Sequence, residues 1–324
     1  MMHVTWFVPS VRKWPWQRWY NYDKVLASTW IRCLQLIPYL SKLGIKSKIN
    51  EWDNKTQIAV FLRRWNEQDQ AIAAQLKQKY VKIILDTPVN YFSSQNLPAF
   101  EGKIRDHFMS FAELADAILC PSSYIEQYGR KLGYSVLCLE DSVDVKHFCY
   151  RRKNNIRNDK PVLIWSGVSV KAESLNFLAT SITRNNWPII IISDKKPRLE
   201  FDFTFIKWRY KSFPRNILKG DIGIFPRFVD NEYDMGHSFF KIGVFLAQGL
   251  PVLCSPVVSY EQVINESNGM VVSELDALRW ERDIKKAMMK LDVFDFKENP
   301  VMEYSSERVA LRYQKEFSEI LSEQ

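Results

Sequence analysis

The chain has 324 residues, of which 46% are apolar and 25% are charged, and this ordinary globular composition in a chain of this length allows two domains. Its longest apolar runs are only strand-sized and its first residues lack the pattern of a signal peptide, which argues against membrane-spanning and secreted proteins. The net charge of +8 favours anionic partners, namely phosphates, nucleic acid or an acidic membrane surface, and does not choose among them.

Strand and helix patterns alternate through the first half of the chain. Short apolar runs predict strands at 3–8, 57–61, 81–85, 117–120 and 135–139. Helical spacing predicts helices at 28–43, with a kink at Pro38, and at 66–80 and 122–132. This alternation indicates βαβ units, and therefore a mostly parallel sheet with helices on both faces.

The charged stretch 150–160 is typical of a solvated linker, and beyond it the alternation resumes. The patterns predict strands at 161–165, 187–193 and 203–208, a helix at 172–183 and a long last helix at 306–321. We therefore expect an α/β fold with two Rossmann-like domains facing a cleft, and a C-terminal helix that crosses back. The expected ranges are 1–155, 156–300 and 301–324. Such sheets bind ligands at the carboxyl ends of their strands, so we expect the site in the cleft.

The segment 220–272 carries the clearest functional signal, with the pattern strand, long polar loop, helix, strand, helix, strand. Its loop brings Gly236, His237 and Ser238 to the start of a helix that has Lys241 in its first turn. A lysine there opposes the positive end of the helix dipole unless an anion binds beside it. The segment thus predicts a phosphate held by backbone N–H groups, Ser238 and Lys241; a solvated lysine on an ordinary capped helix is the alternative.

Two runs of the sequence carry a family resemblance. The run 115–148 contains a strand, a helix that begins with serine and a V-D-x-x-x-F turn. The run from 220 contains D-I-G-x-x-P, S-x-x-K-x-x-x-x-x-A-x-G-x-P-V-x-x-S and N-G-x-x-V, at Asp221, Ile222, Gly223, Pro226, Ser238, Lys241, Ala247, Gly249, Pro251, Val252, Ser255, Asn268, Gly269 and Val272. Both runs resemble GT-B glycosyltransferases, with retaining family four as the nearest relatives.

The sequence also departs from the family-four pattern. The two glutamates of the family's E-x7-E pair correspond to Gly236 and Val244. In the family's G-R-x4-K-G element Gly167 is kept, the arginine is replaced by Val168, and the lysine Lys171 comes two residues early. The chain is therefore expected to be a divergent member, or one without activity.

The resemblance implies transfer of a sugar from a nucleotide diphosphate donor to an acceptor hydroxyl. The first domain would then bind the acceptor and the second the donor, with no cofactor beyond the nucleotide sugar. Because the sequence has no D-x-D metal motif, we expect a metal-independent site in which Lys241, Lys171 and the helix N-terminus near Ser238 compensate the diphosphate charge. Lys171 is alternatively a surface charge at a helix start.

Further candidate residues lie at the ends of predicted strands and in loops. Trp208 could stack on the nucleobase, or only pack in the core. Asp86, which closes a strand, and His107 are the candidate catalytic residues, and each has a structural alternative as a turn former or a core histidine. His237 could contact the sugar or cap a helix.

The segment 12–22 interleaves cations with aromatic residues, and its candidate acceptor-binding residues are Arg12, Trp14, Trp16, Arg18 and Trp19. The pattern is compatible with stacking on an acceptor sugar, with contact at a membrane interface, or with binding of single-stranded nucleic acid. No nucleic-acid motif supports the last, and an ordered surface loop is a fourth possibility. The expected place of the segment beside the cleft favours the acceptor.

Five scattered cysteines without C-x-x-C spacing argue for reduced thiols in a cytoplasm, and against zinc or disulfides. We therefore expect a cytoplasmic glycosyltransferase of polysaccharide biosynthesis, whose glycan or lipid-linked acceptor would allow contact with the inner membrane surface, and which does not bind nucleic acid. The alternatives are a non-catalytic binding or scaffold protein on a degenerate GT-B fold, and a nucleotide-sugar 2-epimerase.

Overall fold

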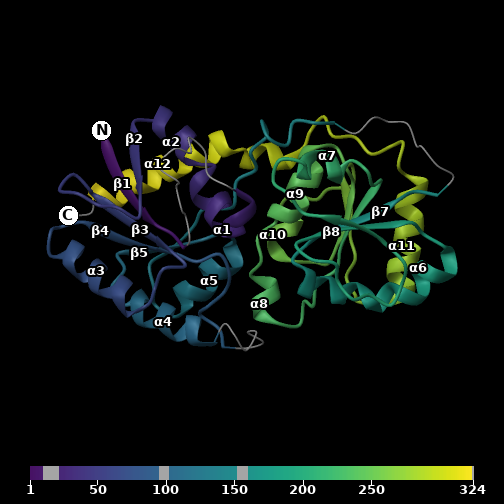
Figure 1. Ribbon diagram of the computed structural model, residues 1–324, viewed down its shortest axis with the longest axis horizontal. Helices are drawn as coiled ribbons and strands as arrows, with labels where there is room; N and C mark the ends of the chain where they lie inside the picture. Colours follow the sequence, from purple (N-terminus) through teal and green to yellow (C-terminus); the bar gives the residue numbers. More distant parts are fainter. Residues whose placement is uncertain (10–21, 95–101, 152–159, 323–324) are drawn as a thin grey trace. The chain divides into compact units, whose positions relative to one another are not determined.

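The computed structural model describes residues 1–9, 22–94, 102–151 and 160–322. These residues form two compact units. Unit 1 comprises Met1–Ser142, Asn231–Ser238 and Glu303–Gln324, and unit 2 comprises Val143–Asp230 and Phe239–Met302. In the described residues, each unit contains a six-stranded parallel sheet (Figure 1). The expected α/β fold with two Rossmann-like parts is confirmed.

The sheet of unit 1 has the strand order β2-β1-β3-β4-β5-β6. Its strands are β1 (Met2–Phe7), β2 (Ile45–Ile49), β3 (Ile58–Leu62), β4 (Lys82–Asp86), β5 (Ala117–Cys120) and β6 (Val136–Cys138). All except β2 match a predicted strand. The sequence of β2 is IKSKI, and only Ile45 is fully buried because β2 lies at the sheet edge. An edge strand needs few apolar residues, so the apolar runs did not reveal it.

The helices of unit 1 are α1 (Ala27–Thr29), α2 (Ile37–Lys42), α3 (Glu67–Lys77), α4 (Gly102–Ala112), α5 (Ser123–Lys131), α8 (Glu232–Met235) and α12 (Ser306–Ser322), with the π-helical turn η2 (Trp30–Leu34) between α1 and α2. The single helix predicted at 28–43 is therefore wrong in detail. Pro38 has no N–H to donate to the carbonyl of Leu34, and just before it the N–H of Gln35 donates to the carbonyl of Trp30, five residues back. The helix widens into the π-helical turn and is interrupted at residues 35–36, and α2 begins at Ile37, just before the proline.

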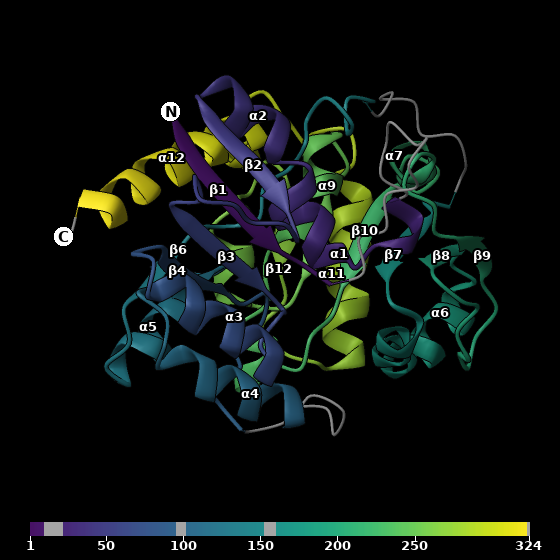
Figure 2. The same ribbon diagram turned by 60° about the vertical axis from the view of Figure 1, so that its left-hand side comes forward.

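Neighbouring residues of β1 face opposite sides of the sheet, as the period of a strand requires. Phe7 stacks on Phe61 at 4.4 Å between ring centroids, in the core that α3, α4 and α5 share with the strands. Trp6 contacts Tyr313 and Phe317 of α12 on the other face, at 6.0 and 6.2 Å. The last helix therefore returns to unit 1, as expected, and lies with α2 across the sheet from α3 and α4 (Figures 1 and 2).

The sheet of unit 2 has the strand order β12-β11-β10-β7-β8-β9. Its strands are β7 (Leu163–Gly167), β8 (Ile189–Ser193), β9 (Thr204–Lys207), β10 (Ile222–Phe225), β11 (Val252–Cys254) and β12 (Gly269–Val271). β7 is the first strand of this sheet along the chain, β8 and β9 follow on one side of it, and β10 pairs with its other side. This reversal between β7 and β10 is the place where open α/β sheets bind ligands, beyond the carboxyl ends of the strands.

The helices of unit 2 are α6 (Ala179–Asn185), α7 (Phe213–Ile217), α9 (Phe240–Ala247), α10 (Val258–Glu261) and α11 (Ala277–Met289), preceded by the 3-10 helix η4 (Ser169–Leu178); a further 3-10 helix, η5 (Pro300–Tyr304), leads toward α12. The helix predicted at 172–183 thus consists of η4 and α6. In the described part of the chain, no helix has both the length and the apolar character needed to cross a membrane.

Candidate functional site

A small polar pocket lies where the strand order of unit 2 reverses. Its lining residues come from β7, from the end of β10 and from the two helices η4 and α9; they are Trp165, Lys171, Ser174, Phe225, Pro226, Arg227 and Lys241. The empty volume is about 230 Å³, part of it open solvent. The pocket therefore occupies the position that the sheet topology favours for a ligand.

The end of β7 is shaped to admit the side chain of Lys241. A Cβ atom on Gly167 would lie 2.7 Å from Nζ of Lys241 and 2.6 Å from Cη2 of Trp165. In the absence of that atom, the Lys241 amine lies 5.3 Å from the centroid of the Trp165 ring. This distance allows a cation–π interaction, which orients the amine. Gly167 thus leaves space for the Lys241 amine, and Trp165 provides the aromatic ring beside which the amine lies.

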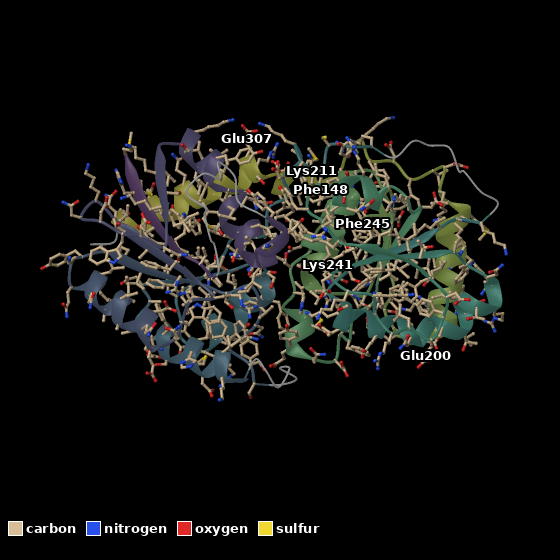
Figure 3. All side chains as sticks on the ribbon, in the orientation of Figure 1. Phe148, Glu200, Lys211, Lys241, Phe245 and Glu307 are labelled. Atoms are coloured by element: carbon tan, nitrogen blue, oxygen red, sulfur yellow. The ribbon has the colours of Figure 1, made fainter. Side chains whose placement is uncertain are left out.

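Lys241 is the second residue of α9, and the rest of that helix is almost entirely apolar and buried. Figure 3 labels the side chain of Lys241 and that of Phe245 in the same helix. Phe245 of α9 is fully buried and packs edge-on against Phe225 of β10 at 4.9 Å between centroids. No side chain caps the helix at Phe239. Because packing fixes the helix, the first-turn lysine is held at the pocket, where an anion would interact with both its charge and the helix dipole.

The second lysine of the pocket is positioned by η4. The backbone N–H of Ser169, the first residue of η4, donates to Oδ1 of Asp194 at 2.7 Å. Two residues on, the N–H of Lys171 donates to the carbonyl of Val168, and Ser174 Oγ donates to the carbonyl of Lys171. These bonds fix the backbone on both sides of Lys171.

Three cations, Lys171, Arg227 and Lys241, line this one pocket, and none of its seven described lining residues is acidic. Arg227 is only 9% exposed. A pocket lined by three cations favours an anionic ligand. The arrangement suits a phosphate-bearing ligand and the stabilisation of negative charge that develops on it.

Comparisons with known proteins place this geometry in a recognised architecture. The structure is similar to that of HepE from Anabaena, solved with UDP-glucose, with a TM-score of 0.68, 10% identity, and coverage of 98% of this chain and 100% of that one. It is also similar to a glycosyltransferase from Rickettsia africae, with a TM-score of 0.65, 11% identity and coverage of 100% and 99%. A third similar structure is AviGT4, a glycosyltransferase of avilamycin A biosynthesis, at a TM-score of 0.59 and 11% identity over 100% of this chain and 99% of that one.

The fold is that of the GT-B glycosyltransferases. No family model matches the sequence, and no curated protein does. At identities near 10% the likeness establishes the fold alone, and membership of family four stays a prediction.

Of the predicted donor-binding residues, the GT-B fold brings Gly167, Lys171 and Lys241 together at one pocket. Trp208 follows β9, and its N–H donates to the carbonyl of Ser193 while its half-buried ring packs 6.0 Å from that of Phe213. The strand order puts β9 at the sheet edge, with β8 between it and β7. Trp208 is therefore not a lining residue of the pocket, and base stacking stays a prediction.

The predicted phosphate loop belongs to unit 1 rather than to unit 2. The carbonyl of Gly236 accepts a hydrogen bond from Ser122 Oγ at 3.1 Å. A Cβ atom on Gly236 would lie 3.0 Å from Cβ of Asn90, so a side chain would crowd this contact. Nδ1 of His237 lies 2.8 Å from the carbonyl of Tyr233 in α8, which is the contact of a helix cap. Ser238 is half-buried, and the phosphate role of these residues stays a prediction.

Asp86 closes β4, as predicted, but its side chain is fully buried rather than open to a ligand. Its Oδ1 accepts from Nε of Arg32 at 2.8 Å, and Nη1 of Arg32 donates to Asp141 at 2.8 Å and to the carbonyl of Leu139 at 2.9 Å. Burial raises the pKa of Asp86 to about 6, although the Arg32 charge acts in the opposite direction. The expectation that Asp86 faces a ligand is thus corrected, because a distant arginine pairs with it inside unit 1. His107 is half-buried on α4, and its catalytic role stays a prediction.

The predicted acceptor-binding residues Arg12, Trp14, Trp16, Arg18 and Trp19 lie outside the described residues. Within the described ranges there is no group of three or more His, Cys, Asp or Glu side chains that could hold a metal ion. The five cysteines are free thiols, and three of them are buried.

The sequence did not single out Arg227, Trp165 or Ser174 as site residues. A signal for Arg227 was nevertheless present, because it stands two residues beyond the end of β10. Cations that follow a buried strand of a parallel sheet are candidates for ligand binding by the same rule that selected the other residues. Trp165 had no such signal, since a tryptophan inside a strand is most simply a core residue.

Proposed function

We propose that this chain is a glycosyltransferase that binds the diphosphate of a nucleotide sugar in the pocket between β7 and β10. The single observation that carries the proposal is the amine of Lys241 held over Trp165 beside Lys171, at the reversal of the strand order. The similarity to HepE, which was solved with UDP-glucose, supports a nucleotide sugar as the ligand class.

The proposed chemistry assigns the charge of the leaving group to this pocket. When the bond between the sugar and the diphosphate breaks, the electron pair leaves with the terminal phosphate oxygen. Fixed cations lower the energy of that developing charge without reorganising during the reaction. Lys241 and Lys171 would contact the phosphate oxygens. The anomeric carbon would form a bond to the acceptor oxygen, and the proton of that hydroxyl would pass to the departing phosphate or to water.

The finer parts of the proposal come from the sequence. They are a metal-independent reaction of the retaining family-four type, a glycan or lipid-linked glycan as acceptor, and a role in polysaccharide biosynthesis in the cytoplasm, beside the inner membrane surface. These parts are independent of one another, and evidence against any of them would leave the proposed donor site unchanged.

The test is nucleotide binding by calorimetry and thermal shift, with UDP, ADP, GDP and their glucose conjugates, with and without EDTA. A ligand that binds only the folded protein raises its stability with the logarithm of its concentration over Kd. We expect one nucleotide family to bind equally with and without EDTA. Lys241→Met, which keeps the side-chain length, should bind it about ten- to one-hundred-fold more weakly, because a charge-assisted hydrogen bond is lost.

The matched control is Lys219→Met, which removes an exposed lysine of unit 2 that does not line the pocket. It should bind like the parent protein. Binding of no nucleotide, or equal binding by Lys241→Met, would overturn the proposal.

A second candidate, a non-catalytic binding protein, is favoured by a specific observation. Val244, at the place of the second family-four glutamate, is fully buried on α9, and Asp86 is held by Arg32. A nucleotide that binds while neither transfer nor hydrolysis of its sugar conjugate is detected would support this candidate. Conversion of the sugar conjugate to an epimer would instead support the epimerase alternative.

A further inference from the structure

The pocket contains a third cation, and its placement suggests a specific task. We infer that Arg227 is a diphosphate-binding residue and that it sets a preference for two linked phosphates over one. The inference rests on the proposed function of the same pocket. It concerns a residue that neither the sequence motifs nor the similar structures assign.

The first argument is position in the sheet. β10 pairs with β7 in parallel, with Ile222 opposite Leu163 and Gly223 opposite Ile164. Arg227 stands two residues beyond the end of β10, whereas Lys171 lies in η4, which follows β7, and Lys241 lies in α9. All three line the pocket. Arg227 therefore brings a cation to the pocket from the β10 side.

The second argument is that the backbone of Arg227 is held in place. Its N–H donates to Oγ of Ser255 at 2.8 Å, and that serine is buried just after β11. The N–H of Ser255 in turn donates to the carbonyl of Phe225. Pro226, between them, has a fixed φ angle. Hydrogen bonds between the two neighbouring strand ends thus hold the main chain at Arg227, and the backbone has little conformational entropy left to lose when a ligand binds.

The third argument is chemical. A guanidinium is a planar fork that donates two parallel hydrogen bonds to phosphate oxygens, whereas an ammonium acts as a point charge. Arg227 is largely buried, so its interaction with a bound anion would be screened less than that of a surface cation. Two lysines can compensate a single phosphate group. A third cation beside them becomes useful when the ligand carries a second phosphate.

The experiment compares UDP with UMP, and uses inorganic pyrophosphate and inorganic phosphate as probes without a base. Kd values are measured by calorimetry for the parent protein, Arg227→Gln and Arg227→Lys. The matched control is Arg198→Met, which removes an exposed arginine of unit 2 outside the pocket lining. Circular dichroism and thermal unfolding establish that each variant is folded.

We expect Arg227→Gln to weaken binding of UDP and pyrophosphate by about ten-fold or more, and binding of UMP and phosphate by much less. Arg227→Lys should lose part of the same preference, because it keeps the charge without the fork. If Arg227→Gln folds poorly, the test is the ratio of Kd for UMP to Kd for UDP in Arg227→Lys, which should be smaller than in the parent protein.

The inference would be overturned if both Arg227 variants kept the parent's ratio of Kd for UMP to Kd for UDP while Lys241→Met bound all four probes more weakly. The proposed function would then still stand. Failure of the parent protein to bind any probe would overturn both. Equal loss in Arg198→Met would attribute the effect to net charge and would also overturn the assignment to Arg227.

Discussion

The buried carboxylate of Asp86 offers a quantitative test, because a structural anion and a catalytic base respond differently to substitution. Asp86→Asn keeps the shape of the side chain and removes its charge. Arg32 would keep its hydrogen bonds to Asp141 and to the carbonyl of Leu139. The variant therefore isolates the contribution of one buried, titrating group to the stability of unit 1.

The expected effect follows from the difference between the folded and unfolded pKa of Asp86. The folded value is about 6, and an unperturbed aspartate titrates near 3.9. Between these values the folded state binds the proton more tightly, so the free energy of unfolding falls as the pH rises. Two pKa units correspond to about 3 kcal/mol, which is present below about pH 4 and lost by about pH 6 to 7. The Asn variant has no such proton. The stability of the parent relative to Asp86→Asn should therefore fall by that amount across this window.

The assay is hydrogen exchange of peptides from β4 at increasing urea, followed by mass spectrometry from about pH 4.5 to 7.5 for both proteins. Local exchange reports on unit 1 without requiring both units to unfold together. A difference between parent and variant that does not change with pH would refute the raised pKa. A difference that grows with pH would show that the attraction of Arg32 outweighs burial. If Asp86→Asn is as stable as its parent at neutral pH yet loses sugar transfer, the sequence-based catalytic prediction stands.

Two further substitutions test the packing around the pocket and beneath α12. Gly167→Ala should displace both the Lys241 amine and the buried Trp165 ring, because its Cβ would lie 2.7 Å from Nζ and 2.6 Å from Cη2. We expect about ten-fold weaker UDP binding by calorimetry together with a lower Tm, and unchanged affinity would contradict the role of the glycine. Tyr313→Phe removes a buried hydroxyl that has no hydrogen-bond partner among the described residues; stability to urea should stay the same or rise by about 1 kcal/mol, and a comparable loss would reveal a partner for the hydroxyl.

Most of the fold could be predicted because buried parallel strands are short, apolar and regularly spaced by helices. The pattern failed where tertiary context replaces apolar content, as at β2, whose Lys46 and Lys48 are exposed at the sheet edge. It also failed at α4, where Ile104, Phe108 and Phe111 have the spacing of one helix face but were not interpreted as a helix. The sequence of β2 carries little apolar signal for a strand, whereas the sequence of α4 does carry the periodicity of a helix.

The site could be predicted in part, because the sequence shows which residues follow strands but not which distant side chains meet them. Gly167, Lys171 and Lys241 were identified from their positions and meet at one pocket. Asp86 was placed correctly at a strand end, yet its partner Arg32 is 54 residues away and comes from the irregular turn η2. No local sequence pattern predicts an ion pair between residues so far apart, and only the folded structure shows that Arg32 binds this carboxylate.

The pocket also indicates why a fold can stay recognisable when the sequence matches no family model. The sheet requires only apolar residues at strand spacing, and very many sequences meet that condition. The site requires positive charge and open space beyond the strands where the order reverses. The three cations of the pocket come from three elements, namely η4, α9 and the turn after β10. Positive charge can therefore be supplied to this pocket from several positions in the sequence, and a comparison by aligned positions does not record such a change.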